Sequence, residues 1–301
     1  MKILLTGVTG QVGWELQRTL MTVGEVISVG RSQLNLAQPN TIRHIIREVQ
    51  PDLIINPAAY TAVDQAESEP ELAMTINGIA PGVIAEEAKR LGAAMIHYST
   101  DYVFDGAKTT PYTESDQPNP QNTYGKTKLA GEQAIASVGV PHLILRTSWV
   151  YGLRGKNFLL TMRKLAQEKE EIKVVNDQVG APTWSRVIAE ATAQILSQAR
   201  QDVSGFLAHQ SGLYHLTASG ETNWYGFAQA IFTHDVQHDQ RKLQRLIAIN
   251  SKDYSTAASR PAYSLLNSQK LTNAFGLILP DWKRSLDLVL AVNCIESSSR
   301  C

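Results

Sequence analysis

The sequence predicts an α/β fold in which a doubly wound parallel sheet is followed by a smaller α+β portion. In the first half, short apolar segments alternate with segments of helical apolar spacing, which is typical of parallel strands joined by crossover helices. After about residue 150 this alternation becomes less regular. Because 301 residues correspond to about two domains, we expect one unit at residues 1–150 and a second at residues 151–301.

The expected strands of the first half are short apolar runs bounded by glycine, proline or polar residues. Such runs are typical of strands buried on both faces. They lie at residues 3–5, 26–29, 53–55, 94–98 and 143–145. Helical spacing of apolar residues predicts helices at residues 14–20 and 42–49, and later at 158–168, 187–199, 224–233 and 282–292.

The composition argues for a local binding site and against a strongly charged binding surface. Lys and Arg together number 28, as do Asp and Glu, so the formal net charge is zero. A neutral chain lacks the positive field that attracts nucleic acids or anionic membranes, so we expect neither partner. Neither a signal sequence nor an apolar stretch of about 20 residues is present, and both cysteines, Cys294 and Cys301, lie near the end. We therefore expect a cytoplasmic protein.

Three glycines, Gly7, Gly10 and Gly13, directly follow the first expected strand and open a helix. Glycines at this spacing permit a tight turn, close approach of the backbone to a pyrophosphate, and close packing of helix on strand. The motif alone is weak, because a plain strand-to-helix turn has the same composition. Its position after the first strand favours a Rossmann-like dinucleotide site.

Gly30 and Arg31 stand at the end of the second expected strand, where sites for NAD usually have a carboxylate. The glycine leaves room and the arginine supplies a forked cation, so the pair suits the 2′-phosphate of NADP(H). NADH stays as an alternative cofactor, and a solvated surface arginine is the alternative interpretation of Arg31.

Tyr124 and Lys128 are four residues apart and therefore share one face of a helix. An ammonium close to a phenol favours the phenolate, so we expect Lys128 to lower the pKa of Tyr124 and to make it a proton donor. Ser99 and Thr100 follow the fourth expected strand, at the sheet edge where ligands bind in α/β folds. For Tyr124 and Lys128, the alternative interpretation is an amphipathic surface pair.

These motifs, in this order, resemble the extended short-chain dehydrogenase/reductase family. Longer strings resemble more narrowly the dTDP-4-dehydrorhamnose reductases of that family. They lie at residues 97–104 (HYSTDYVF), 124–132 (YGKTKLAGE), 146–151 (RTSWVY) and 176–183 (NDQVGAPT). The resemblance extends from residue 2 to about residue 290. Such a set of strings is far more specific than any one motif.

The resemblance assigns roles to individual positions. Thr100, Tyr124 and Lys128 would be catalytic: Tyr124 donates the proton, Thr100 hydrogen-bonds the substrate oxygen, and Lys128 holds the nicotinamide ribose. Thr100 and Asp101 would contact the sugar nucleotide. So would Trp149, for which core packing is the alternative. Apart from the resemblance, the forked cation of Arg260 suits the diphosphate of the substrate, with bracing of its own loop as the alternative. The expected cofactor residues are Gly7, Gly10, Gln11, Val12, Gly13, Gly30, Arg31, Ala59, Tyr60, Thr61, Tyr124 and Lys128.

The activity that the resemblance implies is reduction of the C4 ketone of dTDP-4-dehydro-L-rhamnose by NADPH, the last step of dTDP-rhamnose biosynthesis. Residues 1–150 would bind NADP(H), and residues 151–301 would bind mainly the sugar nucleotide, with segments that return to the first unit. Tyr102 stands where dehydratases of the family have a glutamate, and no cysteine for an epimerase precedes Cys294. The alternatives are a reductase of another nucleotide-linked keto sugar and a non-catalytic NADP-binding regulatory subunit, such as that of methionine adenosyltransferase.

Some of these reductases form dimers around a divalent cation held by carboxylates of both chains. Glu15 matches one of those ligands, but Arg186 and Val292 stand at the other two positions. A hard cation needs several oxygen ligands, and an arginine repels it. We therefore expect no metal ion, no metal-bridged dimer, and a monomer or weak homodimer.

Overall fold

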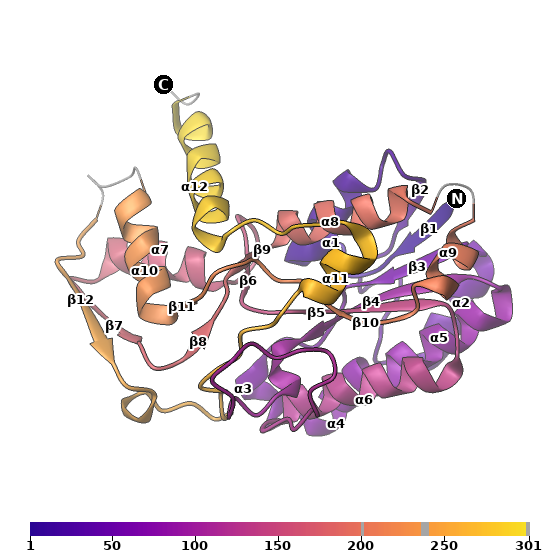
Figure 1. Cartoon of the computed structure of the whole chain (residues 1–301), viewed down its shortest axis with the longest axis horizontal. Coiled ribbons are helices and arrows are strands. Elements are labelled where there is room, and N and C mark those ends of the chain that lie inside the picture. The colour runs from indigo at the N-terminus through magenta and orange to yellow at the C-terminus, as the bar shows by residue number, and fades with distance from the viewer. Residues whose placement is uncertain (200–201, 236–240, 299–301) are drawn as a thin grey trace.

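The computed structural model describes the backbone of residues 1–199, 202–235 and 241–298, and within these ranges the side chains as far as residue 291. Cys301 and the side chains of Val292 and Cys294 lie outside the described residues. A layered α/β unit fills one side of the molecule, and a smaller group of helices and short strands fills the other (Figure 1). No helix in the described part of the chain has the length and apolarity needed to cross a bilayer.

The centre of the larger unit is a six-stranded parallel sheet with the order β10-β5-β4-β3-β1-β2. Every strand predicted for the first half lies in it, so the predicted fold class is confirmed. One edge strand comes from beyond residue 150, because β10 pairs with β5. The strands are β1 (Lys2–Leu5), β2 (Glu25–Ser28), β3 (Leu53–Asn56), β4 (Ala94–Thr100), β5 (His142–Thr147) and β10 (Gly212–His215).

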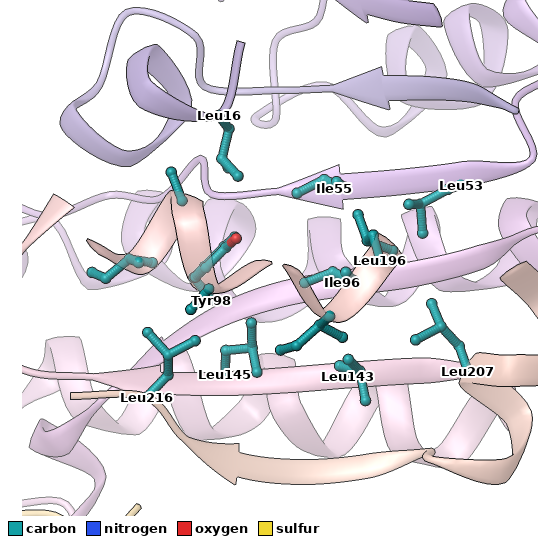
Figure 2. Packing of buried hydrophobic residues seen from close by; sticks show 14 of the residues in the cluster. Leu16, Leu53, Ile55, Ile96, Tyr98, Leu143, Leu145, Leu196, Leu207 and Leu216 are labelled. Atoms are coloured by element: carbon teal, nitrogen blue, oxygen red, sulfur yellow. The ribbon is translucent and has the colours of Figure 1, made fainter. Parts of the chain in front are cut away.

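Helices cover both faces of the sheet (Figure 1). One face packs against α1 (Gln11–Thr19), α8 (Ser185–Ser197), α9 (Val203–His209) and α11 (Gln269–Phe275). The other packs against α2 (Pro39–Val49), α5 (Ala80–Leu91) and α6 (Thr123–Val138). Figure 2 shows Leu16 and Leu196 from the first group of helices beside Leu53, Ile55 and Ile96 of the sheet. Full burial of such side chains stabilises the fold by about 1.5–3 kcal/mol each.

The smaller unit has its own apolar core around Tyr151, Trp184, Phe227 and Trp282. Its helices lie close to the predicted segments, and its strands form two-stranded pairs, of which β7–β12 and β6–β9 are parallel and β8–β11 is antiparallel. The helices are α7 (Phe158–Glu168), α10 (Trp224–His234) and α12 (Trp282–Ser298). The strands are β6 (Val150–Tyr151), β7 (Glu171–Val175), β8 (Val179–Gly180), β9 (Thr183–Trp184), β11 (Thr222–Asn223) and β12 (Arg245–Ile249).

The order of the strands reverses between β1 and β3. From β1 the chain adds β2 on one side, and from β3 it adds β4 on the other side. In open α/β sheets ligands bind outside the carboxyl ends of the strands at such a switch point. The segments there follow β1, β3 and β4. Between β3 and α5 lie α3 (Val63–Ala66), α4 (Pro70–Met74) and the π-helical turn η1 (Thr75–Ile79); the 3₁₀ turns η2 (Asp101–Val103) and η4 (Ser251–Asp253) come later.

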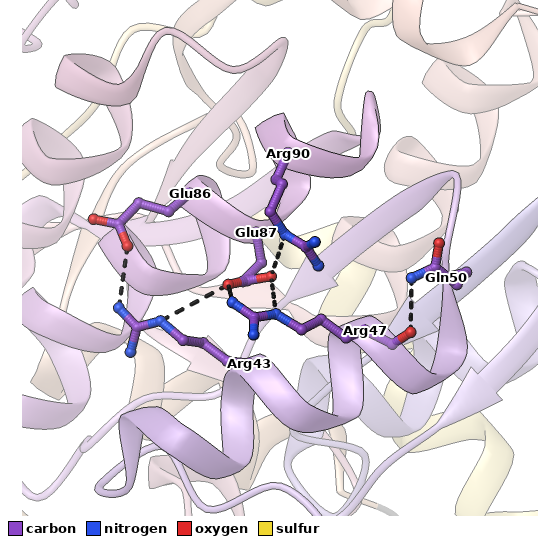
Figure 3. A network of polar contacts seen from close by, with 6 residues as sticks. All are labelled: Arg43, Arg47, Gln50, Glu86, Glu87 and Arg90. Atoms are coloured by element: carbon purple, nitrogen blue, oxygen red, sulfur yellow. Dashed lines mark hydrogen bonds and ion pairs between the residues drawn. The ribbon is translucent and has the colours of Figure 1, made fainter.

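A carboxylate of α5 ties this helix to α2 (Figure 3). The Glu87 side chain is only 4% exposed, and it pairs with Arg47 at 2.6 Å and with Arg90 at 2.9 Å. Arg43 lies 3.8 Å from the same carboxylate. Arg47 foremost, and then Arg90, hold the pKa of Glu87 below its usual value.

We expect Glu87→Gln to lower the free energy of unfolding by about 1–2 kcal/mol at pH 7, because hydrogen bonds to a charged partner are replaced by weaker neutral ones. A carboxylate whose pKa is lowered by folding stabilises the protein at pH values above its unfolded pKa. This stabilisation is lost as the pH falls through the folded pKa. Urea unfolding should therefore show the full difference at pH 7 and its progressive loss as the pH falls below about 4. A difference that persists in acid would contradict a charge effect.

Candidate active site

A cavity of about 780 Å³ lies at the carboxyl edge of the sheet, at the switch point. Every residue that the sequence predicted to bind a cofactor lines it. The cavity extends from the turn after β1, past the segment after β3, to the start of α6. Its residues also include Ser99, which was expected at this edge of the sheet, and Thr6, Thr147 and Lys156, which had no signal in the sequence.

The turn between β1 and α1 requires its glycines. Gly7 has a φ of 60°, and a Cβ there would lie 2.9 Å from the Ala58 backbone. A Cβ at Gly13 would lie 2.2 Å from the carbonyl oxygen of Gly7, so helix and turn are packed as closely as backbones permit. No acidic residue occupies the first turn of α1. Its N-terminus therefore offers unpaired N–H groups and positive potential to an anion in the cavity.

Gln11 joins this turn to the second half of the chain. Its side-chain amide donates to the carbonyl oxygen of Val150 at 3.3 Å and accepts from Asn157 at 2.9 Å. Asn157 also caps α7 through the backbone N–H of Leu160. The turn between β1 and α1 is thus fixed by the segment 150–157, whose Lys156 lines the same cavity.

Gly30 and Arg31 lie at the opposite end of the cavity from α6. A Cβ at Gly30 would meet nothing within 4 Å, so space is open beside it. Arg31 is exposed and has no ion pair with another described residue. The pair therefore offers an unengaged guanidinium beside an open volume, as a phosphate group requires.

Asn77, which the sequence analysis missed, fixes the segment after β3. Its side chain accepts from the backbone N–H of Tyr60 at 2.8 Å, donates to the carbonyl oxygen of Tyr60 at 3.0 Å, and donates to Thr127 at 3.2 Å. Asn77 lies in the π-helical turn η1, and such turns are frequent at functional sites. A local wide turn of this kind has no reliable signal in a single sequence.

Tyr124 lines the other end of the cavity, and the buried residues Thr100 and Asp101 lie next to it. Thr100 Oγ1 lies 3.1 Å from Asp101 Oδ1, and Thr100 also hydrogen-bonds Tyr124. Burial raises the pKa of Tyr124 to about 12 and that of Asp101 to about 6. The expectation that Lys128 lowers the pKa of Tyr124 was wrong for this geometry, because removal of the phenol from water dominates and the opposing influence comes from Thr100.

Lys128 is buried beneath the cavity. Its Nζ donates to the carbonyl oxygen of Tyr98 at 2.6 Å and lies 3.1 Å from Nε2 of His97. Burial lowers its pKa to about 8. Tyr124 and Lys128 both line the cavity, as their shared helix face predicted.

Two buried hydroxyl groups at the cavity wall indicate that the cavity suits a polar ligand. Ser99 is 4% exposed and Thr147 is 8% exposed, and neither hydroxyl oxygen has a hydrogen-bond partner among the described residues. A buried polar atom without a partner is costly, so a ligand that hydrogen-bonds it gains affinity. The donor set therefore fits a long ligand with an anionic middle and a polar end, as a nicotinamide dinucleotide has.

A second cavity of about 1170 Å³ lies in the smaller unit and is lined by Arg260, Lys173 and Trp224 among others. Arg260 contacts Asp64 through 2.7 and 3.1 Å hydrogen bonds and also donates to the carbonyl oxygen of Ala258. Asp64 belongs to α3, so this contact ties the second half of the chain to the first. Arg260 thus braces its loop and faces the cavity as well.

Trp149 is held in an unusual backbone conformation, with a φ of 44°. Its ring stacks on that of Trp224, with centroids 3.5 Å apart and planes 6° apart. A Cβ at residue 180 would lie 2.6 Å from the Trp149 ring, so Gly180 makes room for it. Left-handed backbone at a bulky residue is strained and is frequent at ligand sites.

At the expected metal position, Arg186 pairs with Glu15 at 3.3 Å. No group of three or more metal-ligating side chains is found among the residues whose placement is described. The absence of a metal-bridged dimer stays a prediction.

Comparison with known proteins identifies the family. The family described as "RmlD substrate binding domain" matches residues 1–294. A dTDP-4-dehydrorhamnose reductase of Burkholderia thailandensis is 47% identical over 292 residues, which cover 96% of this chain and 97% of that protein. The chain belongs to the dTDP-4-dehydrorhamnose reductase family. The family predicted from the sequence strings is therefore confirmed.

Solved structures of the dTDP-4-dehydrorhamnose reductase family have the same fold as this chain over almost its whole length. A member from Clostridium acetobutylicum superposes with a TM-score of 0.88 at 36% identity, covering 97% of this chain and 99% of that one. A member from Bacillus anthracis, solved in complex with NADP, has a TM-score of 0.86 at 33% identity, with coverage of 96% and 98%.

Proposed function

We propose that this protein reduces the C4 ketone of dTDP-4-dehydro-L-rhamnose to dTDP-L-rhamnose with NADPH. The observation that carries the proposal is the grouping of Tyr124 and Lys128 at one end of a cavity suited to a dinucleotide, with Thr100 hydrogen-bonded to Tyr124. The relatives named as reductases and the NADP complex of one of them support the same activity.

The cofactor would lie along the first cavity. The N-terminus of α1, with Gly10, Gln11 and Val12, would receive the pyrophosphate, and Arg31 the 2′-phosphate. Ala59, Tyr60 and Thr61 would line the path toward the nicotinamide, with Gly7, Gly13 and Gly30 providing space. Bound NADPH would supply the hydride that the ketone carbon accepts.

The chain's own residues would handle the proton. As negative charge develops on the ketone oxygen, Tyr124 would donate its phenolic proton and Thr100 would donate a hydrogen bond. A Tyr124 pKa of about 12 keeps the phenol protonated at neutral pH. Lys128, whose amine is held by Tyr98 and His97, would bind the nicotinamide ribose, and solvent would return the proton to Tyr124.

The sugar nucleotide would occupy the second cavity and extend toward Tyr124. Arg260 would face its diphosphate, and Trp149 and Asp101 would contact the sugar. This assigns NADP(H) binding mainly to residues 1–150 and sugar-nucleotide binding mainly to 151–301, with segments of the second half returning to the first. We also propose a cytoplasmic location and a monomer or weak homodimer without a bridging metal, which light scattering with and without a chelator would test.

The proposed function is tested by NADPH oxidation with enzymatically prepared dTDP-4-dehydro-L-rhamnose, with chromatographic detection of dTDP-L-rhamnose. Turnover of this ketone is the expected result. NADPH binding without turnover of any nucleotide-linked keto sugar would instead indicate a non-catalytic binding protein.

We expect Arg31→Ala to raise the KM for NADPH roughly 10- to 100-fold and to leave the KM for NADH almost unchanged, because only NADPH has the 2′-phosphate that a charge-assisted contact would bind. Initial rates with each cofactor measure both values. Arg245→Ala is the matched control, since Arg245 is an exposed arginine paired with Glu171 in the smaller unit. Equal losses with both cofactors would refute the role of Arg31.

A further inference from the structure

A buried histidine lies directly behind Lys128. His97 on β4 is 1% exposed, and its Nε2 is 3.1 Å from Lys128 Nζ. Lys128 also donates to the carbonyl oxygen of Tyr98 at 2.6 Å. Because an ammonium has three N–H donors, these two contacts leave one for the cavity that Lys128 lines.

The other nitrogen of the imidazole is held as well. His97 Nδ1 is 3.2 Å from Nδ2 of Asn56, its register partner on β3. Asn56 in turn accepts from the hydroxyl of Thr6 at 2.6 Å. Thr6 and Asn56 are fully or almost fully buried. A hydrogen-bonded chain from Lys128 to Thr6 therefore crosses three adjacent strands beneath the cavity.

We propose that His97 is a positioning residue for the reduction, which holds the Lys128 amine in the orientation that serves the cofactor and Tyr124. The inference rests on the proposed function for the role of Lys128. His97 could not be selected from the sequence, because an isolated histidine in an apolar strand gives no signal of its partner.

An imidazole suits this position better than another polar group. With its proton on Nδ1 it accepts from an ammonium, and with its proton on Nε2 it donates to a neutral amine. In the arrangement found, Asn56 Nδ2 donates to Nδ1 and Asn56 Oδ1 accepts from Thr6, which leaves the ring proton on Nε2. Because an amide and a hydroxyl each have both a donor and an acceptor, rotation of these two groups reverses both hydrogen bonds and places the proton on Nδ1. The contact with Lys128 is therefore kept when the amine gains or loses a proton.

Two other groups near Lys128, Glu132 and Tyr124, are less suited than His97 to hold its amine in place. Glu132 on the same helix favours the ammonium, but its carboxylate is bound to Arg146 on β5 by hydrogen bonds of 2.8 and 2.6 Å. Tyr124, one turn earlier on α6, stays neutral because burial raises its pKa. Burial, and then Lys128, lower the pKa of His97 well below its usual value. The ring is therefore neutral, with one nitrogen able to accept.

The experiment compares His97→Leu, which removes both hydrogen bonds, with His97→Gln, which keeps a donor and an acceptor. We expect His97→Leu to lower kcat roughly tenfold with an unchanged KM for the sugar nucleotide, as for the loss of one buried contact. The basic limb of the kcat–pH profile should move about one unit lower, because the ammonium loses an acceptor. NADPH affinity, titrated by fluorescence without sugar, should weaken at a correspondingly lower pH. His97→Gln should recover most of each effect.

His215→Leu is the matched control. His215 is a fully buried histidine on β10, and its ring lies edge-on to Phe104, away from Lys128. It should lower the melting temperature and leave both pH profiles unchanged. Where His97→Leu does not fold, His97→Asn, whose side chain is too short to keep the contact, replaces it in the comparison with His97→Gln.

Loss of stability with wild-type pH profiles in both His97 variants would overturn the proposal and leave His97 a packing residue. A wild-type protein that binds NADPH but does not reduce the ketone would contradict the proposed function instead. In that case the pH dependence of NADPH binding would still decide whether His97 positions Lys128.

Discussion

Tyr124→Phe is expected to lower kcat for the keto sugar roughly 10³-fold, without unfolding the protein. The substitution removes only the hydroxyl that donates the proton, and general acid catalysis contributes about 10²- to 10⁴-fold. The ring keeps its edge-to-face contact with Tyr102, at a centroid distance of 5.7 Å. NADPH oxidation under saturating substrate, together with a thermal melt, measures both parts.

The matched control for this prediction is Tyr214→Phe. The Tyr214 hydroxyl donates to the carbonyl oxygen of Gln210 at 2.9 Å, on an edge strand outside the cofactor cavity. Its loss should leave kcat within about twofold, because only a local hydrogen bond is removed. Undiminished turnover by Tyr124→Phe would refute the assignment of the proton donor.

Residues that act through local spacing were predictable from the sequence. Tyr124 and Lys128 share a helix face whatever the rest of the fold does, and Gly7 and Gly13 lie where a strand meets a helix. Each of these signals is complete within a few residues. The structure places all four around one cavity, as the sequence analysis expected.

Residues that act through tertiary contacts were not predictable in the same way. Asn77 reaches Tyr60, 17 positions away, from a π-helical turn, and His97 reaches Lys128 across 31 positions. A propensity argument has no access to such partners. For the same reason the return of β10 to the sheet edge could not be located, since its short apolar run resembles many others.

The pKa of Tyr124 shows the limit of reasoning from spacing alone. A lysine four positions away lowers the pKa of a phenol only as far as its charge outweighs the desolvation of that phenol. Here the phenol is buried, and the lysine amine is directed to Tyr98 and His97. Whether Lys128 tunes Tyr124 thus depends on what holds Lys128, which makes His97 informative.

A buried ion pair connects α6 to the sheet. Arg146 on β5 is 1% exposed and Glu132 on α6 is 6% exposed, and two hydrogen bonds of 2.8 and 2.6 Å join them. Arg146 precedes Thr147, which lines the cavity, and Glu132 lies one turn beyond Lys128. The pair therefore fixes the side of α6 that presents the proposed catalytic residues.

Glu132→Ala is expected to lower the free energy of unfolding by about 3–5 kcal/mol, because it leaves a buried guanidinium without its counter-charge. Urea unfolding at pH 7 measures this loss. The double variant Glu132→Leu with Arg146→Met removes both charges at similar volume and should recover most of it, because no unpaired charge is then buried. By contrast, Glu86→Ala removes a surface pair whose carboxylate is 57% exposed, and it should cost less than about 1 kcal/mol. If Glu132→Ala cost no more than Glu86→Ala, the pair would not be what holds α6 against the sheet.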